Sequence, residues 1–132
     1  MILVDSSVLI NFFRGVENEQ TRKFELVLQR GIPFGINGII YQELLQGAKS
    51  DKELKMLDEY LSTQVFYKLR KGIESYRAAA SIYLKCRKKG IIIRSTVDLI
   101  IAQTAIENNV YLLHDDNDFT NIAAVERNLK EY

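Results

Sequence analysis

The sequence predicts an α/β fold in which helices cover both faces of a parallel sheet of short strands. Short apolar runs alternate along the chain with longer segments of helical periodicity, an order typical of parallel sheets. The first run, Ile2-Leu3-Val4, has no polar position, as expected of a strand buried on both faces. With 132 residues, 47% of them hydrophobic, the chain fits one domain over residues 1–132 and can bury a real core.

The N-terminal half is predicted to alternate strands and helices. Asp5-Ser6-Ser7 can cap a helix that ends near Arg14, and Asn37-Gly38 opens a later one. Ser50-Asp51-Lys52-Glu53 fits the capping-box pattern of a further helix. The expected elements are strands over residues 2–4 and 32–36, and helices over residues 6–14, 19–30, 38–47 and 51–61. Their inward side chains are expected to be Val8, Leu9, Phe12, Phe13, Phe24, Val27, Leu28, Ile40, Tyr41, Leu44, Leu45, Leu54, Leu57 and Leu61.

The C-terminal half is predicted to follow the same order. The expected elements are strands over residues 65–67 and 110–113, and helices over residues 73–89, 97–108 and from about residue 121. Gly90 ends the long helix, and Ser95-Thr96 caps the next one. The buried side of the long helix is expected to carry Tyr76, Ala79, Ala80 and Tyr83, with Arg77, Ser81, Lys85 and Lys88 or Lys89 opposite.

The composition excludes several kinds of site. A single cysteine, Cys86, excludes a disulfide framework and a thiolate metal cage, and it indicates a reducing cytoplasm. A single histidine, His114, excludes a histidine-rich metal site and argues against a histidine-based triad, so hydrolytic chemistry must rest mainly on carboxylates. No apolar run approaches the roughly 18 residues of a membrane span, and Met1 leads directly into the first strand without a cleavable signal.

Positive charge is concentrated in one part of the chain. Residues 68–94 contain nine basic residues and one acid, Glu74, so this segment carries a charge of +8 on a protein whose net charge is +1. Such a segment is either an electrostatic footprint for a polyanion or a well-solvated helix face. The sequence alone leaves these two interpretations open.

Acidic residues gather where strands are predicted to end. Asp5 follows the first strand, and Asp115, Asp116 and Asp118 follow the strand over residues 110–113. In open parallel sheets, ligands bind beyond the carboxyl ends of the strands. Asp5 alone could be only a helix cap. Three acids within four residues repel one another, so the cluster costs stability unless a cation neutralises it.

Two further acids interrupt apolar helices. Glu43 lies beside the apolar stripe of its helix, and Asp98 lies in the apolar run Val97-Asp98-Leu99-Ile100-Ile101-Ala102. Glu43 can instead be an exposed flank residue, and Asp98 a first-turn acid favoured by the helix dipole. Both residues can also converge with the strand-end acids at one sheet edge. Several carboxylates without histidine or thiolate are the ligands of a hard cation such as Mg²⁺ or Mn²⁺.

Four short segments occur in an order and at a spacing that are specific when taken together. They are Ile2-Leu3-Val4-Asp5-Ser6-Ser7-Val8-Leu9-Ile10, Glu43-Leu44-Leu45-Gln46-Gly47-Ala48, Asp98-Leu99-Ile100-Ile101-Ala102 and Leu112-Leu113-His114-Asp115-Asp116-Asn117-Asp118-Phe119. The chain thereby resembles the PIN-domain nucleases, and more narrowly the VapC-type ribonuclease toxins of toxin–antitoxin pairs. The resemblance implies a three-layer α/β/α sandwich on a parallel sheet of about five strands.

The resemblance also implies the residues of an active site. The implied catalytic residues are Asp5, Glu43, Asp98 and Asp116, with Asp118 and Ser7 as accessory residues. Of these, Asp5, Asp98 and Asp116 would hold Mg²⁺ or Mn²⁺, and Glu43 would orient or deprotonate the attacking water. The family's Leu-Leu-x-x-Asp-x-Asp-Phe pattern places the main ligand at Asp116, and alternation past the strand turns Asp115 to the opposite side. Asp118 is expected to cap the terminal helix or bind through a water.

The implied function is a Mg²⁺-dependent endoribonuclease that leaves 5′-phosphate and 3′-hydroxyl ends. Its partners would be RNA, held through Arg77, Lys85 and Lys88, a small VapB-like antitoxin, and a second copy in a homodimer. Two positions depart from many relatives. Ile40 stands where a small hydroxyl residue is frequent, and His114 where threonine or serine is frequent. His114 is expected to orient the loop or to lie partly exposed at the strand end.

The acidic cluster also allows three other interpretations. An aspartyl-phosphate phosphohydrolase would use Asp5 as nucleophile, but enzymes of the haloacid dehalogenase type need a second aspartate where Ser7 stands. A phosphoreceiver domain would need a lysine after a late strand, and residues 110–119 contain none. A nuclease-like fold that only binds a partner is disfavoured by the complete set of carboxylates.

Overall fold

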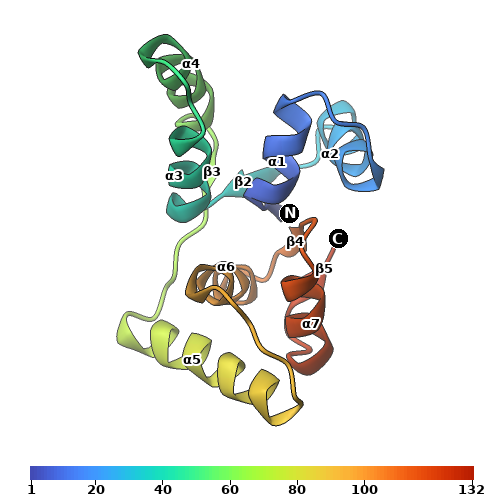
Figure 1. Cartoon of the computed structure of the whole chain (residues 1–132), viewed down its shortest axis with the longest axis vertical. Helices are drawn as coiled ribbons and strands as arrows, with labels where there is room; N and C mark the ends of the chain where they lie inside the picture. The colour runs from blue at the N-terminus through green and yellow to red at the C-terminus, as the bar shows by residue number, and fades with distance from the viewer.

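The computed structural model describes all 132 residues and contains one sheet of five parallel strands (Figure 1). The strands are β1 (Ile2–Val4), β2 (Phe34–Ile36), β3 (Val65–Phe66), β4 (Tyr111–Leu113) and β5 (Lys130–Glu131). Their order across the sheet is β3-β2-β1-β4-β5, so β1 is central and lies between β2 and β4. All three residues of β1 are buried, as the unbroken apolar run predicts.

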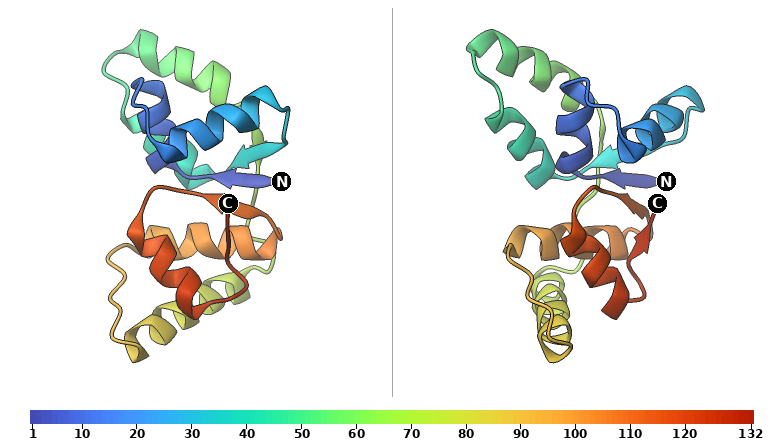
Figure 2. Two further views of the ribbon diagram at one scale, coloured as in Figure 1. Left: turned by 90° about the vertical axis from the view of Figure 1, so that its right-hand side faces the viewer. Right: turned by 45° about the vertical axis from the view of Figure 1, so that its right-hand side comes forward.

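Seven helices cover the sheet. They are α1 (Ser6–Phe13), α2 (Glu19–Gln29), α3 (Gly38–Gln46), α4 (Asp51–Leu61), α5 (Ile73–Lys88), α6 (Thr96–Glu107) and α7 (Asn117–Val125). Figure 2 shows α1–α4 on one side of the sheet and α5–α7 on the other. The predicted α/β sandwich with five parallel strands is therefore confirmed. No helix is both long and apolar enough to cross a membrane.

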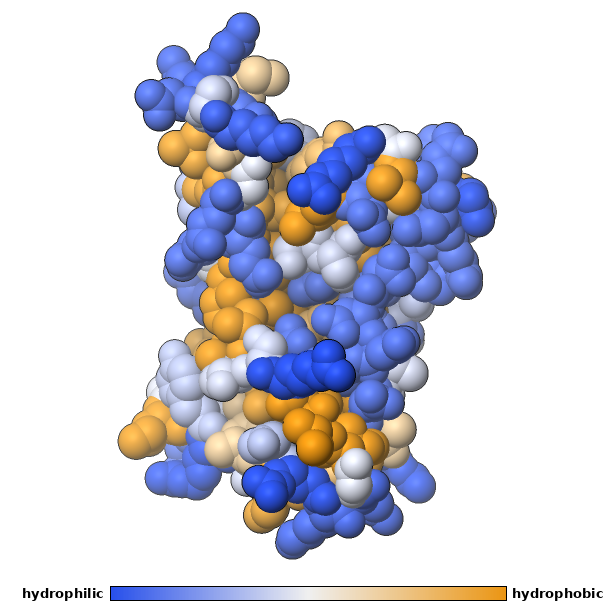
Figure 3. Space-filling view, in the orientation of Figure 1, coloured by the Kyte–Doolittle hydropathy of each residue, from blue (hydrophilic) through white to orange (hydrophobic).

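The core consists of 26 buried hydrophobic residues drawn from the strands and the inner helix faces. Gly35 in β2 has no room for a side chain, because a Cβ atom there would lie 2.5 Å from the carbonyl oxygen of Val65 and 2.8 Å from the ring of Tyr67. Only glycine therefore fits between β2 and β3 at this position. Figure 3 shows mostly hydrophilic side chains on the face seen in Figure 1, with apolar residues exposed mainly around the narrow middle and over the lower part.

Most expected helix boundaries agree with the structure within one or two residues, but the last helix begins earlier than expected. It begins at Asn117 rather than near residue 121, because Asp116 caps it by accepting a hydrogen bond from the backbone N–H of Asp118. The cap is thus Asp116, and not Asp118. The two-residue strand β5 was not predicted, because both of its residues are polar and exposed.

The buried face of α5 differs from the predicted one. Its buried residues are Ser75, Ala79, Ile82 and Cys86, whereas Tyr76 is 57% exposed and Ala80 is also exposed. Small side chains on this face let α5 lie close to α6 and α7. The expected inward positions Phe13, Leu28 and Leu54 are also exposed, so these helices bury narrower faces than their apolar residues suggest.

Candidate metal centre

The carboxyl ends of β1, β2 and β4 lie side by side, because these strands are parallel neighbours. Asp5 directly follows β1, and Asp116 lies three residues beyond the end of β4. The helix after β2 carries Glu43, and the first turn of α6 carries Asp98. The sheet order thus brings acids from four separate parts of the sequence to one edge.

Asp5 is both a helix cap and a buried acid at this edge. It is only 4% exposed, and its Oδ2 accepts hydrogen bonds from the N–H of Ser7 at 3.0 Å and from the Ser7 hydroxyl at 2.6 Å. Burial raises the pKa of Asp5, the bonds from Ser7 oppose this rise, and the charge of Asp116 adds to it. Neither bond from Ser7 uses Oδ1 of Asp5. The cap and a ligand role are therefore compatible.

Ser7 joins the ends of β1 and β4. Its hydroxyl donates to Asp5 and accepts a hydrogen bond from the backbone N–H of Asp115 at 3.0 Å. The carboxylate of Asp115 itself accepts a long bond of 3.5 Å from the side chain of Asn18. Ser7 thus fixes the loop after β4 against the start of α1, while the Asp115 side chain faces a different neighbour from Asp116.

Asp98, Asp116 and Asp118 form the tightest group of acids. Each offers a carboxylate oxygen, and these oxygens lie within 4.8 Å of one another. The pKa of Asp98 is raised to about 7, first by burial and then by the negative charges of four acids: Asp116, Asp5, Asp118 and Glu43. Five carboxylates therefore repel one another at this edge. An all-oxygen donor set of this kind fits a hard divalent cation such as Mg²⁺ or Mn²⁺.

Glu43 lies at the margin of this group, on the exposed side of α3. Its Oε2 accepts a hydrogen bond of 3.3 Å from the hydroxyl of Ser6, a contact that the sequence analysis did not anticipate. Burial and the charge of Asp5 raise the pKa of Glu43. A pocket of about 390 Å³ opens beside it and is lined by Ile39, Gln42, Glu43, Gln46, Ser95, Val97 and Asp98. Two of the five acids therefore face a space that can admit a ligand.

The basic residues singled out in the sequence lie on α5, in the other helix layer from α3. Arg77 pairs with Glu74 at 2.8 Å, and Lys85 pairs with Glu126 at 2.7 Å. Lys88, in the last turn of α5, forms no salt bridge. Of the three expected RNA contacts, Lys88 alone keeps its charge uncompensated by a neighbouring carboxylate.

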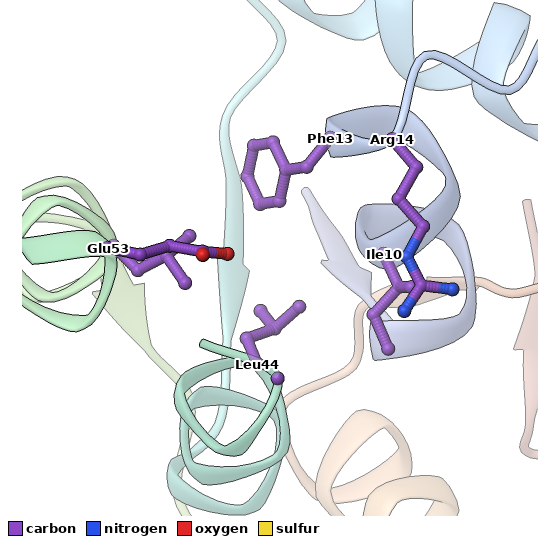
Figure 4. Close-up of a pocket in the computed structure, with 7 residues that line it drawn as sticks. Ile10, Phe13, Arg14, Leu44 and Glu53 are labelled. Carbon is purple, nitrogen blue, oxygen red and sulfur yellow. The ribbon is translucent and has the colours of Figure 1, made fainter. Parts of the chain in front are cut away.

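A second pocket, smaller and more apolar, lies between α1, α3 and α4 (Figure 4). Its volume is about 140 Å³. Figure 4 shows the side chains of Ile10, Phe13 and Leu44 converging on it, with Glu53 reaching in from α4. Arg14 also lines the pocket, so a positive and a negative side chain, Arg14 and Glu53, lie beside its apolar residues.

Comparisons with known proteins find similar sequences and a similar fold. A family model described as the PIN domain matches residues 2–125. The chain is 29% identical over 126 residues to VapC ribonuclease Mb1587 of Mycobacterium bovis and to ribonuclease VapC11 of Mycobacterium tuberculosis, covering 95% of this chain and 93% of each relative. A crystal structure of VapBC2 from Rickettsia felis, bound to a DNA fragment from their promoter, superposes with a TM-score of 0.72 at 20% identity, covering 100% of this chain and 98% of that one.

Proposed function

The chain belongs to the PIN-domain family, and on this basis we propose that it is a Mg²⁺-dependent endoribonuclease acting as the toxin of a VapBC-type toxin–antitoxin pair. In this proposal residues 1–132 form a single nuclease domain. Its relatives named VapC are ribonucleases by name. The observation that carries the proposal is the convergence of Asp98, Asp116 and Asp118 within 4.8 Å, beside the buried Asp5 and the pocket at Glu43.

The proposed reaction is hydrolysis of an RNA phosphodiester. A bound divalent ion neutralises charge on the phosphoryl oxygens and makes water easier to deprotonate. Asp5, Asp98 and Asp116 would hold the ion, with Asp118 as an accessory ligand. Glu43 would accept the proton of the attacking water at Oε1, because the hydroxyl of Ser6 already donates to Oε2. A raised pKa suits Glu43 to this task, because it brings the carboxyl closer to neutral pH.

The substrate would lie over the pocket beside Glu43 and Asp98. A site lined by five acids repels a polyanion, so RNA binding needs positive charge elsewhere on the surface. We place that charge on α5 and the segment after it. Lys88 is free for this role. The pair of Arg77 with Glu74 is exposed on both sides and contributes little to stability, so an RNA phosphate can replace Glu74. The side chain of Glu126 is only 12% exposed, so Lys85 would contact RNA while still paired with Glu126.

The proposed inhibitor is a small antitoxin of the VapB type. We propose this partner because a solved VapBC structure has a similar fold. The antitoxin would bind at the apolar pocket between α1, α3 and α4. Phe13 is exposed at the mouth of that pocket, and Met56 and Tyr60 of α4 are exposed as well. An amphipathic segment with apolar anchors and charged flanks fits such a site.

The homodimer remains a separate proposal. On α5 the side chains of Ile73, Tyr76 and Leu84 are exposed, which is unusual for large apolar groups on one helix. We assign these three side chains to contact with a second copy. Arg77 and Lys88 lie on the same helix face, four residues after Ile73 and Leu84, so they would border this contact and bind RNA at its edge. Light scattering after size-exclusion chromatography would report a dimer near twice the 15.2 kDa of one chain, and a monomer at all concentrations would contradict this part of the proposal.

The test of the function is an RNA cleavage assay with the purified protein. Cleavage is expected with Mg²⁺, and not in EDTA or with the Asp98→Asn variant. Asp115→Asn serves as the matched control, since this acid lies outside the close group. Phosphorylation of Asp5 by acetyl phosphate, with no RNA cleavage by the wild-type protein, would instead support a phosphoreceiver domain.

A further inference from the structure

The C-terminal strand β5 reaches the loop that carries Asp116. Glu131 pairs in register with Leu112 of β4, one strand position before Leu113. From there its Oε2 lies 2.7 Å from Nε2 of His114 and also accepts a hydrogen bond of 3.1 Å from the hydroxyl of Thr120. The buried side chain of Leu129 and the contact of Tyr132 with Tyr111 hold this segment against β4, whereas Glu131 itself is exposed.

His114 connects Glu131 to the metal-binding loop. Its side chain is 9% exposed and packs against the ring of Phe119, with ring centroids 5.1 Å apart. Its Nδ1 accepts a hydrogen bond of 3.2 Å from the backbone N–H of Asp116. Because Nδ1 accepts, the ring proton lies on Nε2 and is donated to Glu131. The glutamate therefore selects the tautomer that can hold the Asp116 amide.

Two consecutive backbone amides of this loop thus donate hydrogen bonds to side chains. The N–H of Asp115 donates to the hydroxyl of Ser7, and the N–H of Asp116 donates to His114. The carboxylate of Asp116 then accepts from the N–H of Asp118 at 2.9 Å, which starts α7. Carboxylates that repel one another tend to move apart unless the backbone beneath them is fixed.

We propose that His114 and Glu131 are positioning residues, which hold the amide of Asp116 so that its carboxylate meets those of Asp98 and Asp118. This inference rests on the proposed metal-dependent function and adds to it a role for the C-terminal strand. Partners of this kind, beyond the ligands themselves, fix the orientation of metal ligands in other proteins. Neither residue touches the ion or the RNA in this proposal.

Two substitutions at His114 separate positioning from packing. In His114→Asn, the side-chain oxygen can take the place of Nδ1 and accept from Asp116, but the side chain is too short to reach Glu131. In His114→Gln, the longer amide can donate to Glu131 while the acceptor for Asp116 is lost. Lys130→Ala is the matched control for β5, because its Nζ bonds to Asn109 and not to the loop.

The readouts are the dissociation constant for Mn²⁺, measured by calorimetry on the full chain, and the melting temperature. We expect His114→Gln to weaken Mn²⁺ binding about tenfold or more, His114→Asn to stay within about threefold of wild type, and Glu131→Ala to fall between them. Glu131→Gln, whose amide oxygen still accepts from Nε2, should restore most of the loss, and Lys130→Ala should bind normally.

Two results would overturn the inference. Normal Mn²⁺ affinity in His114→Gln would show that the Asp116 amide needs no acceptor. Equal losses of affinity in both His114 variants, tracking equal losses of melting temperature, would show that the ring only fills space. Since metal binding is measured without RNA, a wild-type protein that binds Mn²⁺ but cleaves no RNA would refute the proposed function alone.

Discussion

Replacing Asp98 by asparagine is expected to stabilise the metal-free protein at alkaline pH while removing its response to Mg²⁺. Burial and the neighbouring negative charges raise the pKa of the Asp98 carboxyl from its usual 3.8 to about 7 in the folded chain. A folded-state pKa above the unfolded one means that folding takes up protons between these values. Stability therefore falls as pH rises from about 4 to 7, and the full penalty is present above pH 7.

The size of this penalty follows from the same two values. A difference of about three pH units corresponds to at most about 4 kcal/mol. Asp98 is only partly buried, so screening by solvent reduces the penalty, as does its favourable position in the first turn of α6. We expect a gain of about 1–2 kcal/mol for Asp98→Asn at pH 8, or about 3 to 8 °C in melting temperature, and less than about half of that gain at pH 5.

Circular dichroism melts in EDTA at pH 5, 6, 7 and 8 measure this gain, and repeating them with Mg²⁺ measures the response to metal. The wild-type protein should gain stability on adding Mg²⁺ at pH 8, and Asp98→Asn should gain little. Asp115→Asn, whose carboxylate lies outside the close group, should melt like wild type at every pH. A variant less stable than wild type at pH 8 in EDTA, or a gain that does not vary with pH, would refute the reasoning.

Three further predictions concern the loop after β4, the cap at β1 and the apolar pocket. Asp116→Asn should lower the single-turnover cleavage rate at least about a hundredfold, equivalent to about 2.7 kcal/mol. Asp118→Asn should lower the rate less, and Asp115→Asn no more than a few-fold. A larger effect at Asp115 than at Asp116 would mean that the ligands of this loop are assigned wrongly. Asp5→Asn should abolish growth inhibition on expression while melting no lower than wild type, because asparagine also caps helices; an unfolded variant would make Asp5 mainly structural. Phe13→Glu should weaken co-purification of the antitoxin from the native operon and leave RNA cleavage by the isolated protein intact, so an unchanged complex would move the docking site elsewhere.

Features of the fold that depend on local sequence were predictable. The apolar run of β1 and the caps at Asp5 and Ser95 use residues next to one another, so pattern and hydrogen-bonding chemistry suffice to place them. The buried face of α5 was predicted only in part. Ala79 is buried and Tyr83 packs against the core as expected, but Ser75 and Cys86 are buried by packing against other helices and carry little signal of their own. Strand β5 has no apolar residue, and its place beside β4 depends on contacts that the strand's own pattern does not show, such as the burial of Leu129 and the bonds of Glu131.

The candidate site also has features that the sequence predicts and features that only the structure shows. Asp98 stands out in the sequence as an acid within an apolar helix, so its importance could be inferred before its neighbours were known. The closeness of Asp98 to Asp116, and the bond from Ser6 to Glu43, depend on how α6 and α3 lie over the sheet. Asp98 and Asp116 are 18 positions apart in the sequence, and Ser6 and Glu43 are 37 positions apart. Contacts over such separations produce no repeating sequence pattern, so only the structure shows them.

The most direct test of the central claim is the location of a bound metal ion. Crystals grown with Mn²⁺ and measured at its absorption edge give an anomalous peak wherever the ion is held. We expect a peak in contact with carboxylate oxygens of Asp98 and Asp116, with Asp5 or Asp118 bound directly or through water, and no such peak in Asp98→Asn. A peak at another place on the chain, or none beside Asp98 and Asp116 at saturating Mn²⁺, would contradict it.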